Sequence, residues 1–351
     1  MHAVKVGLIA ENPIEWLALR SGLAPTPVID TMHPFILSRA VMAATKLGIF
    51  EALAAGTGTA EEIAAQCGTH PAATGALLGT LMAIGYLRLA GERYALAPVA
   101  RRWLLRKSPR SLRDWALFEF QSWDWVAQLE SFVASGQPLD VHAAMSAEEW
   151  GDYQRAMRTL ASMAGPELAW RTPVPRGART MLDIGGSHGH YSAVLCRRHR
   201  GLRATVLDLP EAVEQAAPLL AAEGLGDRLV HRAGDARSED LGVETYDLVL
   251  LASLVHHFDE PTNRALVRRI ARALRPGGQL VIFESARPAS PGKGGQLAAL
   301  FNLYFALTSE SGLWSYREIA DWQQAAGLRP KKPIRFLSTP GAGLQVGVKP
   351  R

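Results

Sequence analysis

A glycine-rich turn preceded by an acid is the first feature of this sequence that could do chemistry. Met181–Ile184 predicts a buried strand, Gly185, Gly186 and Gly189 predict a tight turn, and the residues after Gly189 predict a helix. A helix that begins directly after such a turn presents unpaired N–H groups and the positive end of its dipole. The pattern therefore predicts a site for a negatively charged, nucleotide-type ligand.

Two further acids follow the next predicted strands. Asp208 comes 19 residues after Gly189, where a carboxylate can accept both hydroxyls of a ribose. Asp235 follows Gly234 and could accept the amino group of an adenine. Each acid also has a structural explanation, because Asp208 could cap a helix and Asp235 could form a turn. Together with Asp183, however, they favour a nucleoside ligand.

Two nucleoside ligands compete for this turn. The dinucleotide fingerprint G-x-G-x-x-G would need a glycine at Ile184 to complete its frame with Gly186 and Gly189. This mismatch disfavours an NAD-dependent oxidoreductase. An acid at the strand end followed by Gly185 and Gly189 instead resembles motif I of the class I S-adenosylmethionine (SAM) methyltransferases.

The elements that must position these residues alternate between strand and helix from Thr180 onward. This order predicts an α/β fold with a Rossmann-like, doubly wound, mostly parallel sheet. Helices are expected between the strands and over 296–308 and 315–326. The predicted strands are Thr180–Ile184, Ala204–Leu207, Arg228–His231, Tyr246–Leu251 and Gln279–Phe283, with closing strands at Pro333–Leu337 and Leu344–Val348.

The N-terminal part is predicted to be mainly helical. A helix over 34–54 precedes a capping box at Thr59–Glu62, a helix from Pro71, and a hairpin within 86–96, which is a winged-helix pattern. A DNA-binding regulator is therefore an alternative function. Residues 71–85 contain no charged side chain and so lack the groups that read phosphates and bases. We expect this domain to form a homodimer and to bind no nucleic acid.

We expect three parts along the chain. These are a winged-helix-like dimerisation domain over 1–107, a helical connector over 108–170 that contributes to a substrate pocket, and a ligand-binding catalytic domain over 171–351. Most of the connector's aromatic residues should be core, and the rest could wall a pocket for a flat, largely apolar acceptor. The expected pocket residues are Trp123, Met157, Met163, Phe301, Asn302 and Phe305.

Composition excludes several other classes. Of 351 residues, 48% are hydrophobic and 20% charged, and the two cysteines do not indicate a disulfide scaffold. Residues 1–12 lack a signal-peptide pattern, and no run reaches about 18 apolar residues. We therefore expect a cytoplasmic protein without membrane contacts. The net charge is +5, and the excess basic residues cluster in 101–113 and 329–335. A solvated helix face explains these clusters more simply than nucleic-acid binding does.

The motifs along the whole chain resemble the plant-type O-methyltransferase family, which includes caffeate- and acetylserotonin-type enzymes, and its bacterial relatives. The matching motifs are Leu182–Gly189, Leu207–Pro210, Gly234-Asp235, Leu254–Asp259 and Arg275–Gly278. The resemblance implies a winged helical dimerisation domain followed by a class I domain with SAM as cofactor. The implied cofactor-binding residues are Asp183, Gly185, Gly186, Gly189, Asp208, Leu209, Asp235, Ala236 and Ser253.

The same resemblance implies a catalytic pair. In that family a histidine near the end of the fourth strand is the general base, and His256 falls at this position. A glutamate after the fifth strand orients the histidine, and Glu284 matches it 28 residues later. The implied activity is methyl transfer from SAM to a hydroxyl of a small aromatic or quinone-like natural product. The alternative for His256 is an ordinary loop histidine.

Three positions depart from the family's pattern. His257 stands where the family often has Asp, Ala252 where it often has Lys, and Gly312–Ser315 where it has a segment with a second catalytic Glu. These departures leave open methylation of carbon, or catalysis mainly by positioning the reactants. His256 and His257 could also suggest a metal site, but adjacent residues rarely both bind one ion, and we expect no metal.

Overall fold

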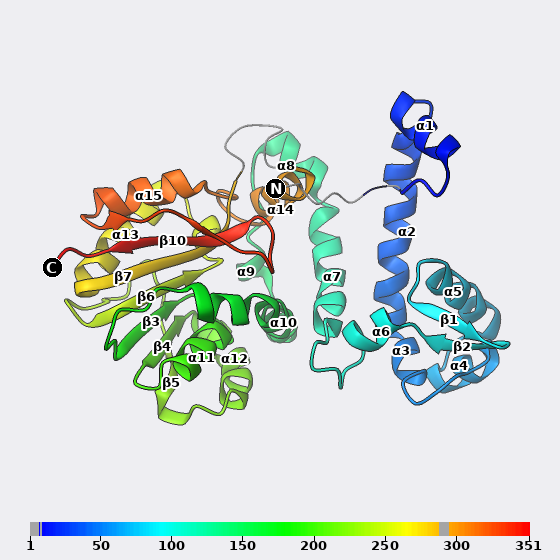
Figure 1. Cartoon of the computed structure of the whole chain (residues 1–351), viewed down its shortest axis with the longest axis horizontal. Coiled ribbons are helices and arrows are strands. Elements are labelled where there is room, and N and C mark those ends of the chain that lie inside the picture. The colour runs from blue at the N-terminus through cyan, green and yellow to red at the C-terminus, as the bar shows by residue number, and fades with distance from the viewer. Residues whose placement is uncertain (1–6, 8, 288–294) are drawn as a thin grey trace. The chain divides into compact units, whose positions relative to one another are not determined.

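The computed structural model describes residue 7, residues 9–287 and residues 295–351 (Figure 1). It divides into two compact units, Val6–Phe120 and Gln121–Arg351, which are described separately below. The three-part division expected at 107 and 170 stays a prediction. Within the described ranges, no helix is long and apolar enough to cross a membrane.

The unit Val6–Phe120 is mainly helical, with one hairpin. The expected capping box is present, because Thr59 and Glu62 exchange hydrogen bonds at the start of a helix, and Pro71 begins the next one. Buried side chains such as Phe50 and Leu78 join the helices to the hairpin in one core. The elements are α1 (Pro13–Ser21), α2 (Thr26–Lys46), α3 (Ile49–Ala52), α4 (Ala60–Cys67), α5 (Pro71–Ala83), β1 (Leu87–Ala90), β2 (Arg93–Leu96) and α6 (Pro98–Trp103), followed by α7 (Arg113–Val126), which runs across the division at Phe120.

The single helix expected over 34–54 is wrong in its bounds. Helix α2 begins at Thr26, with a proline in its first turn, and carries Pro34 in its interior. It ends at Lys46, and Gly48 then adopts the left-handed conformation, with a φ of 79°, before α3 begins. A left-handed residue cannot continue a right-handed helix, so the segment forms two helices.

The unit Gln121–Arg351 contains the predicted sheet (Figure 1). Within its described residues, eight strands form one sheet in the order β5-β4-β3-β6-β7-β10-β8, with β9 also paired to β10. The first five of these strands are parallel, and β10 runs antiparallel to β7. The strands are β3 (Thr180–Ile184), β4 (Arg203–Asp208), β5 (Leu229–Ala233), β6 (Tyr246–Ala252), β7 (Leu274–Ser285), β8 (Arg329–Pro330), β9 (Ile334–Arg335) and β10 (Ala342–Val348).

Helices cover both faces of this sheet (Figure 1), as a doubly wound fold requires. Alternate strand residues point to opposite faces, so Leu182 joins the core under α13 and α15, whereas Met181 joins the core under α10 and α11. The helices are α8 (Leu129–Ser135), α9 (Val141–Ala144), α10 (Ala147–Arg171), α11 (His190–Arg198), α12 (Pro210–Ala222), α13 (Glu260–Ala273), α14 (Gly295–Thr308) and α15 (Tyr316–Ala325).

The closing strands differ from expectation. The strand expected over Pro333–Leu337 is only the two-residue β9, the unexpected β8 lies beside it, and β7 begins at Leu274 instead of Gln279. A strand ends where its hydrogen bonds to the adjacent strand end. The hydrophobic pattern of one strand does not contain the length of the adjacent strand, so it does not predict this end.

Candidate active site

A cavity of about 760 Å³ lies at the carboxyl ends of the central strands. It is lined by Gly185 after β3, Asp208 at the end of β4, Asp235 after β5 and Ser253 after β6. The crevice at this edge of a doubly wound sheet is where such folds bind ligands, and the volume lies in the range of small-molecule sites. Leu209 and Ala236 also line it.

The glycines of the turn have steric reasons to be there. Gly185 has a φ of 66°, and a Cβ on it would lie 2.7 Å from the Leu254 side chain. A Cβ on Gly186 would lie 2.5 Å from the carboxyl carbon of Asp183. The chain therefore passes between two packed side chains where only glycine fits.

The anion expected at this turn is already supplied by the protein. The Ser187 N–H donates to Asp208 Oδ2 at 2.7 Å, and the His190 N–H at the start of α11 donates to His188 Nδ1 at 3.1 Å. The Gly189 N–H donates to the Gly186 carbonyl at 2.9 Å. These three donors are thus occupied within the fold, and the turn serves mainly to hold the Asp208 carboxylate at the cavity.

Asp183 supports the turn from behind. It is 1% exposed, Ser192 Oγ donates to its Oδ2 at 2.6 Å, and burial raises its pKa to about 7. Asp183, Gly186 and Gly189 are not among the residues that line the cavity. Among the described residues, these three therefore shape the site without facing its interior.

Asp208 and Asp235 both face the cavity but differ electrostatically. Burial raises the pKa of Asp208 to about 6, although the N–H groups of Ser187 and Leu209 stabilise its charged form. Hydrogen bonds from Arg237 lower the pKa of Asp235, and the closest pair of atoms lies at 2.8 Å. Asp235 already has a partner, whereas Asp208 has only backbone donors.

The structure brings His256 and Glu284 together. His256 Nδ1 lies 3.0 Å from Glu284 Oε2, and the two residues are 2% and 1% exposed. The Ser285 N–H donates to Glu284 Oε1 at 3.0 Å, and the Tyr316 hydroxyl donates to the Glu284 carbonyl at 3.1 Å. The carboxylate is therefore fixed while it holds the imidazole.

His257 has a different environment from its neighbour. It lines the cavity, which His256 does not, and its Nδ1 lies 3.1 Å from Ser309 Oγ. Its ring meets that of His142 edge-on at 4.8 Å. Burial lowers the pKa of His142 to about 4 and that of His257 well below its usual value. The cavity wall thus carries two imidazoles that are neutral near pH 7.

None of the six expected substrate residues is among those lining this cavity. Phe305 of α14 contacts one of the two paired residues, with its ring centroid 4.0 Å from that of His256. Phe301 packs against Phe305 at 6.4 Å. Asn302 is partly buried on the same helix, and the others are Trp123 of α7 with Met157 and Met163 of α10.

Two residues beside the turn were not predicted. Gln154 of α10 lines the cavity and accepts a hydrogen bond from Ser187 Oγ, and His231 Nε2 of β5 lies 2.9 Å from the Ser187 carbonyl oxygen. Ser187 itself has a φ of 51°. No sequence signal marks either residue. Both lie far from Ser187 in the sequence, Gln154 by 33 residues and His231 by 44, and a single polar residue in a helix is normally solvated.

Comparisons with known proteins agree with this geometry. An O-methyltransferase domain model matches residues 127–329, and an O-methyltransferase dimerisation domain model matches residues 29–106. A 3-hydroxy-5-methyl-1-naphthoate 3-O-methyltransferase of Streptomyces sahachiroi is 28% identical over 93% of this chain and 95% of its own length. An L-tyrosine C(3)-methyltransferase of Streptomyces lavendulae is 27% identical over 82% of each chain.

The fold also matches solved structures. Human N-acetylserotonin methyltransferase, solved in complex with SAM, superposes with a TM-score of 0.83 over 98% of this chain and 100% of its own, at 20% identity. The two domain matches, the Rossmann-like sheet and the acid-lined cavity at its carboxyl edge lead to one assignment. The chain belongs to the O-methyltransferase family and is a SAM-dependent enzyme.

Proposed function

We propose that this enzyme transfers the methyl group of SAM to a hydroxyl of a small aromatic or quinone-like natural product, with His256 as the general base. The observation that carries this proposal is the buried contact of 3.0 Å between His256 Nδ1 and Glu284 Oε2. A carboxylate on Nδ1 selects the tautomer whose Nε2 lone pair is available as a proton acceptor.

The cavity residues fit the cofactor. Asp208 is a pure acceptor, suited to ribose hydroxyls, and Asp235 lines the same cavity after the neighbouring strand β5. One polar atom in the lining, Gln154 Nε2, is buried without a hydrogen-bond partner and so leaves a contact for a ligand to make. When bound, SAM supplies an electrophilic methyl group on a positively charged sulfur.

The residues of the chain handle the proton. Bound SAM would give its methyl group to the acceptor oxygen and would keep the electron pair of the broken carbon–sulfur bond on its sulfur. His256 Nε2 takes the hydroxyl proton, and Glu284 stabilises the resulting imidazolium. The Phe305 ring packs beside the His256 ring, with the two centroids 4.0 Å apart.

The acceptor is proposed from the neighbouring side chains. Phe301 and Phe305, with their rings nearly parallel at 21°, offer flat apolar faces on α14, and Asn302 offers a polar contact beside them. Trp123, Met157 and Met163, which do not line the cavity, stay acceptor contacts proposed from the sequence. The naphthoate named in one relative is an aromatic acceptor of this class.

A carbon acceptor is the second candidate. The relative named as an L-tyrosine C(3)-methyltransferase shows that ring carbon is an acceptor among similar chains, and His257 replaces the acid common at this position in the resembling family. An electron-rich phenolic ring supplies either nucleophile, so the same test has to include both.

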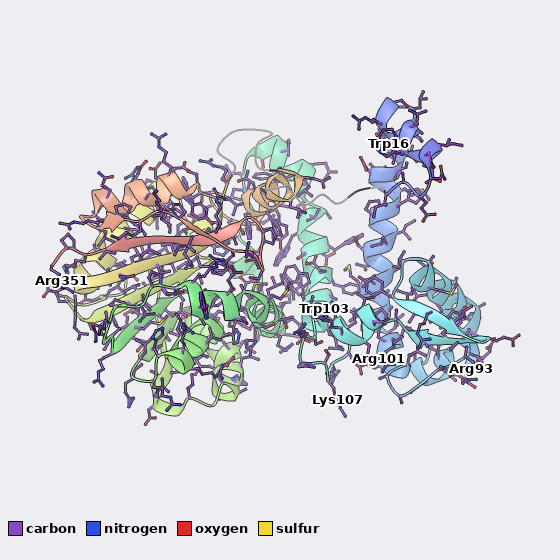
Figure 2. The ribbon with its side chains drawn as sticks, viewed as in Figure 1. Trp16, Arg93, Arg101, Trp103, Lys107 and Arg351 are labelled. Carbon is purple, nitrogen blue, oxygen red and sulfur yellow. The ribbon has the colours of Figure 1, made fainter. Side chains whose placement is uncertain are left out.

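We further propose a homodimer formed by the N-terminal unit. The match to the dimerisation domain supports it, and so does an exposed apolar stripe on α2, where Val28, Met32 and Ile36 are 56%, 54% and 46% exposed. Trp16 of α1, labelled in Figure 2, is also 54% exposed. The absence of nucleic-acid binding and the cytoplasmic location expected from the sequence stay predictions.

The catalytic pair can be tested with labelled SAM and a panel of phenols, hydroxyquinones and enolisable acids. With the best acceptor, we expect His256→Ala to lower kcat by about 10²- to 10⁴-fold while the Kd for SAM stays within a few-fold. Glu284→Gln should cost less, because it removes orientation and charge support but leaves the base.

His257→Ala is the matched control, because this neighbouring histidine lines the cavity without a carboxylate partner in the described structure. We expect a modest loss from it. If His257→Ala abolishes turnover and His256→Ala does not, the base is assigned one residue too early. If only carbon acceptors are methylated, the second candidate function, that of a C-methyltransferase, is correct.

A further inference from the structure

Only one of the two polar atoms in the Gln154 side chain, on α10, has a hydrogen-bond partner. The residue is 1% exposed and lines the cavity, and its Oε1 accepts a hydrogen bond from Ser187 Oγ. Its Nε2 is buried and has no partner. Among the described residues that line the cavity, it is the one buried side-chain polar atom in this condition. Because buried donors are normally paired, this nitrogen marks a contact that a ligand completes.

The amide is held in place by a fully bonded turn. Ser187 donates its hydroxyl to Gln154 Oε1 and its N–H to Asp208 Oδ2 at 2.7 Å, and its carbonyl oxygen lies 2.9 Å from His231 Nε2. All three polar groups of Ser187 are therefore occupied, at a backbone φ of 51° that this bonding maintains. Ser187 thus links the Gln154 amide to the Asp208 carboxylate through its own hydrogen bonds.

The charges around the cavity decide which ligand group needs this donor. Its described lining includes five acids and one cation, Arg237, which is paired with Asp235 at 2.8 Å. The acids are Asp140, Asp208, Glu211, Asp235 and Glu310. The positive groups of SAM fit these acids, but its one anionic group, the carboxylate of the amino-acid tail, meets no unpaired cation there. Neutral donors must hold it.

We infer that Gln154 Nε2 donates a hydrogen bond to the carboxylate of the amino-acid tail of SAM. The Asp208 carboxylate can only accept hydrogen bonds, so it suits the ribose hydroxyls. Gln154 Nε2 can only donate, so it suits the carboxylate of the amino-acid tail. Hydrogen bonds to charged groups are about twice as strong as neutral ones, so the carboxylate gains most from the contact. The inference rests on the cofactor and is independent of the acceptor and of His256.

The test compares two ligands that differ in the tail. Calorimetry measures Kd for S-adenosylhomocysteine, which has the amino-acid tail, and for 5′-methylthioadenosine, which lacks it. We expect Gln154→Met, which keeps the length but removes the donor, to weaken S-adenosylhomocysteine by about 10- to 100-fold. The Kd for 5′-methylthioadenosine should stay within about threefold, because the donor has no tail to meet.

Gln154→Glu is the second variant, since it keeps the shape and an acceptor for Ser187 Oγ but places a charge opposite the tail carboxylate. It should weaken S-adenosylhomocysteine more than Gln154→Met does, again with 5′-methylthioadenosine nearly unchanged. Equal weakening of both ligands would show that Gln154 only supports the turn under Asp208, and would overturn the inference. Failure of the unmodified enzyme to bind either ligand would instead contradict the cofactor itself.

Discussion

Asp183 illustrates, for a single residue, how burial changes the chemistry that a sequence motif suggests. An acid at the end of the first strand looks like a ligand-binding charge, yet Asp183 is enclosed and bonded to Ser192. Burial raises its pKa to about 7, from an ordinary value near 4. Between these values the folded protein binds the proton more tightly than the unfolded chain does. Its contribution to stability is therefore largest below pH 4 and is lost as the pH rises to 7.

Replacing Asp183 by Asn should remove this pH dependence. Without cofactor, we expect the free energy of unfolding of Asp183→Asn, relative to that of the unmodified protein, to increase between pH 4 and 7, by up to about 1.4 kcal/mol per pH unit, because only the unmodified protein loses stability there. Denaturant titrations at several pH values measure the difference. Glu223 also titrates but contributes equally to both proteins, whereas the charge of Asp208 repels that of Asp183, so the pKa of Asp208 should fall in the variant and add to the same change. A difference that does not change with pH would mean that Asp183 is ionised throughout.

The His256–Glu284 pair shows what single residues reveal about a site and what they do not. The motifs identify both residues through a family resemblance. Their separation of 28 residues in the sequence, however, does not predict the distance between their side chains in the folded protein. The register of β6 and β7 supplies it, because Ala252 lies opposite Phe283 and both strands end at the same edge. Gln154 had no such signal, since its role depends on α10 passing beside a turn that comes later in the chain.

At the level of elements, the antiparallel strand β10 supports the carboxylate of Glu284, which we propose to orient His256. Gly343 lies opposite Glu284 in the ladder with β7. A Cβ at this position would overlap the carbonyl oxygen of Ile334 and lie 2.8 Å from the hydroxyl of Tyr316, the group that donates to the Glu284 carbonyl. The strand can approach its neighbours this closely because it has no side chain there.

Gly343→Ala should therefore disturb both stability and catalysis. We expect it to lower the free energy of unfolding by about 1–3 kcal/mol through overpacking, and to lower kcat as Glu284 shifts. Denaturant unfolding and steady-state kinetics measure these two effects. Gly201→Ala is the control, because a Cβ there meets nothing within 4 Å, and it should change stability by less than about 0.5 kcal/mol. Equal effects from the two variants would argue against a crowded β10.

Element types were more predictable than element ends. The alternating pattern identified the strands of the sheet, because buried parallel strands are nearly continuous apolar runs. The ends of α2 and β7 were missed: α2 begins at Thr26 and ends at Lys46, against the expected 34–54, and β7 begins at Leu274, against the expected Gln279. Hydrogen bonding to neighbouring elements decides such ends, and a local pattern does not contain it.

For the whole molecule, the apolar stripe on α2 predicts how two copies associate. Val28, Met32 and Ile36 recur every four residues and so share one side of the helix. Exposed apolar patches of this kind usually mark interfaces. We expect light scattering on the full-length protein to give a dimer, and the double substitution Met32→Glu with Ile36→Glu to give a monomer of 38 kDa.

Val243→Glu is the control for this experiment, because Val243 is 61% exposed in the unit Gln121–Arg351 and lies outside the proposed interface. It should leave the mass unchanged. A dimer that survives the α2 substitutions would place the interface elsewhere on the chain, and an unmodified protein that is monomeric at micromolar concentration would contradict the homodimer.

The five carboxylates around the cavity also bear on how the enzyme completes a catalytic cycle. SAM carries one net positive charge, and the spent cofactor carries none, because methyl transfer turns a sulfonium into a neutral thioether. An acid-lined cavity attracts the first form more than the second. With SAM bound in this cavity, as we propose, methyl transfer would remove part of the attraction that holds the cofactor, which would favour its release and exchange for a fresh cationic molecule.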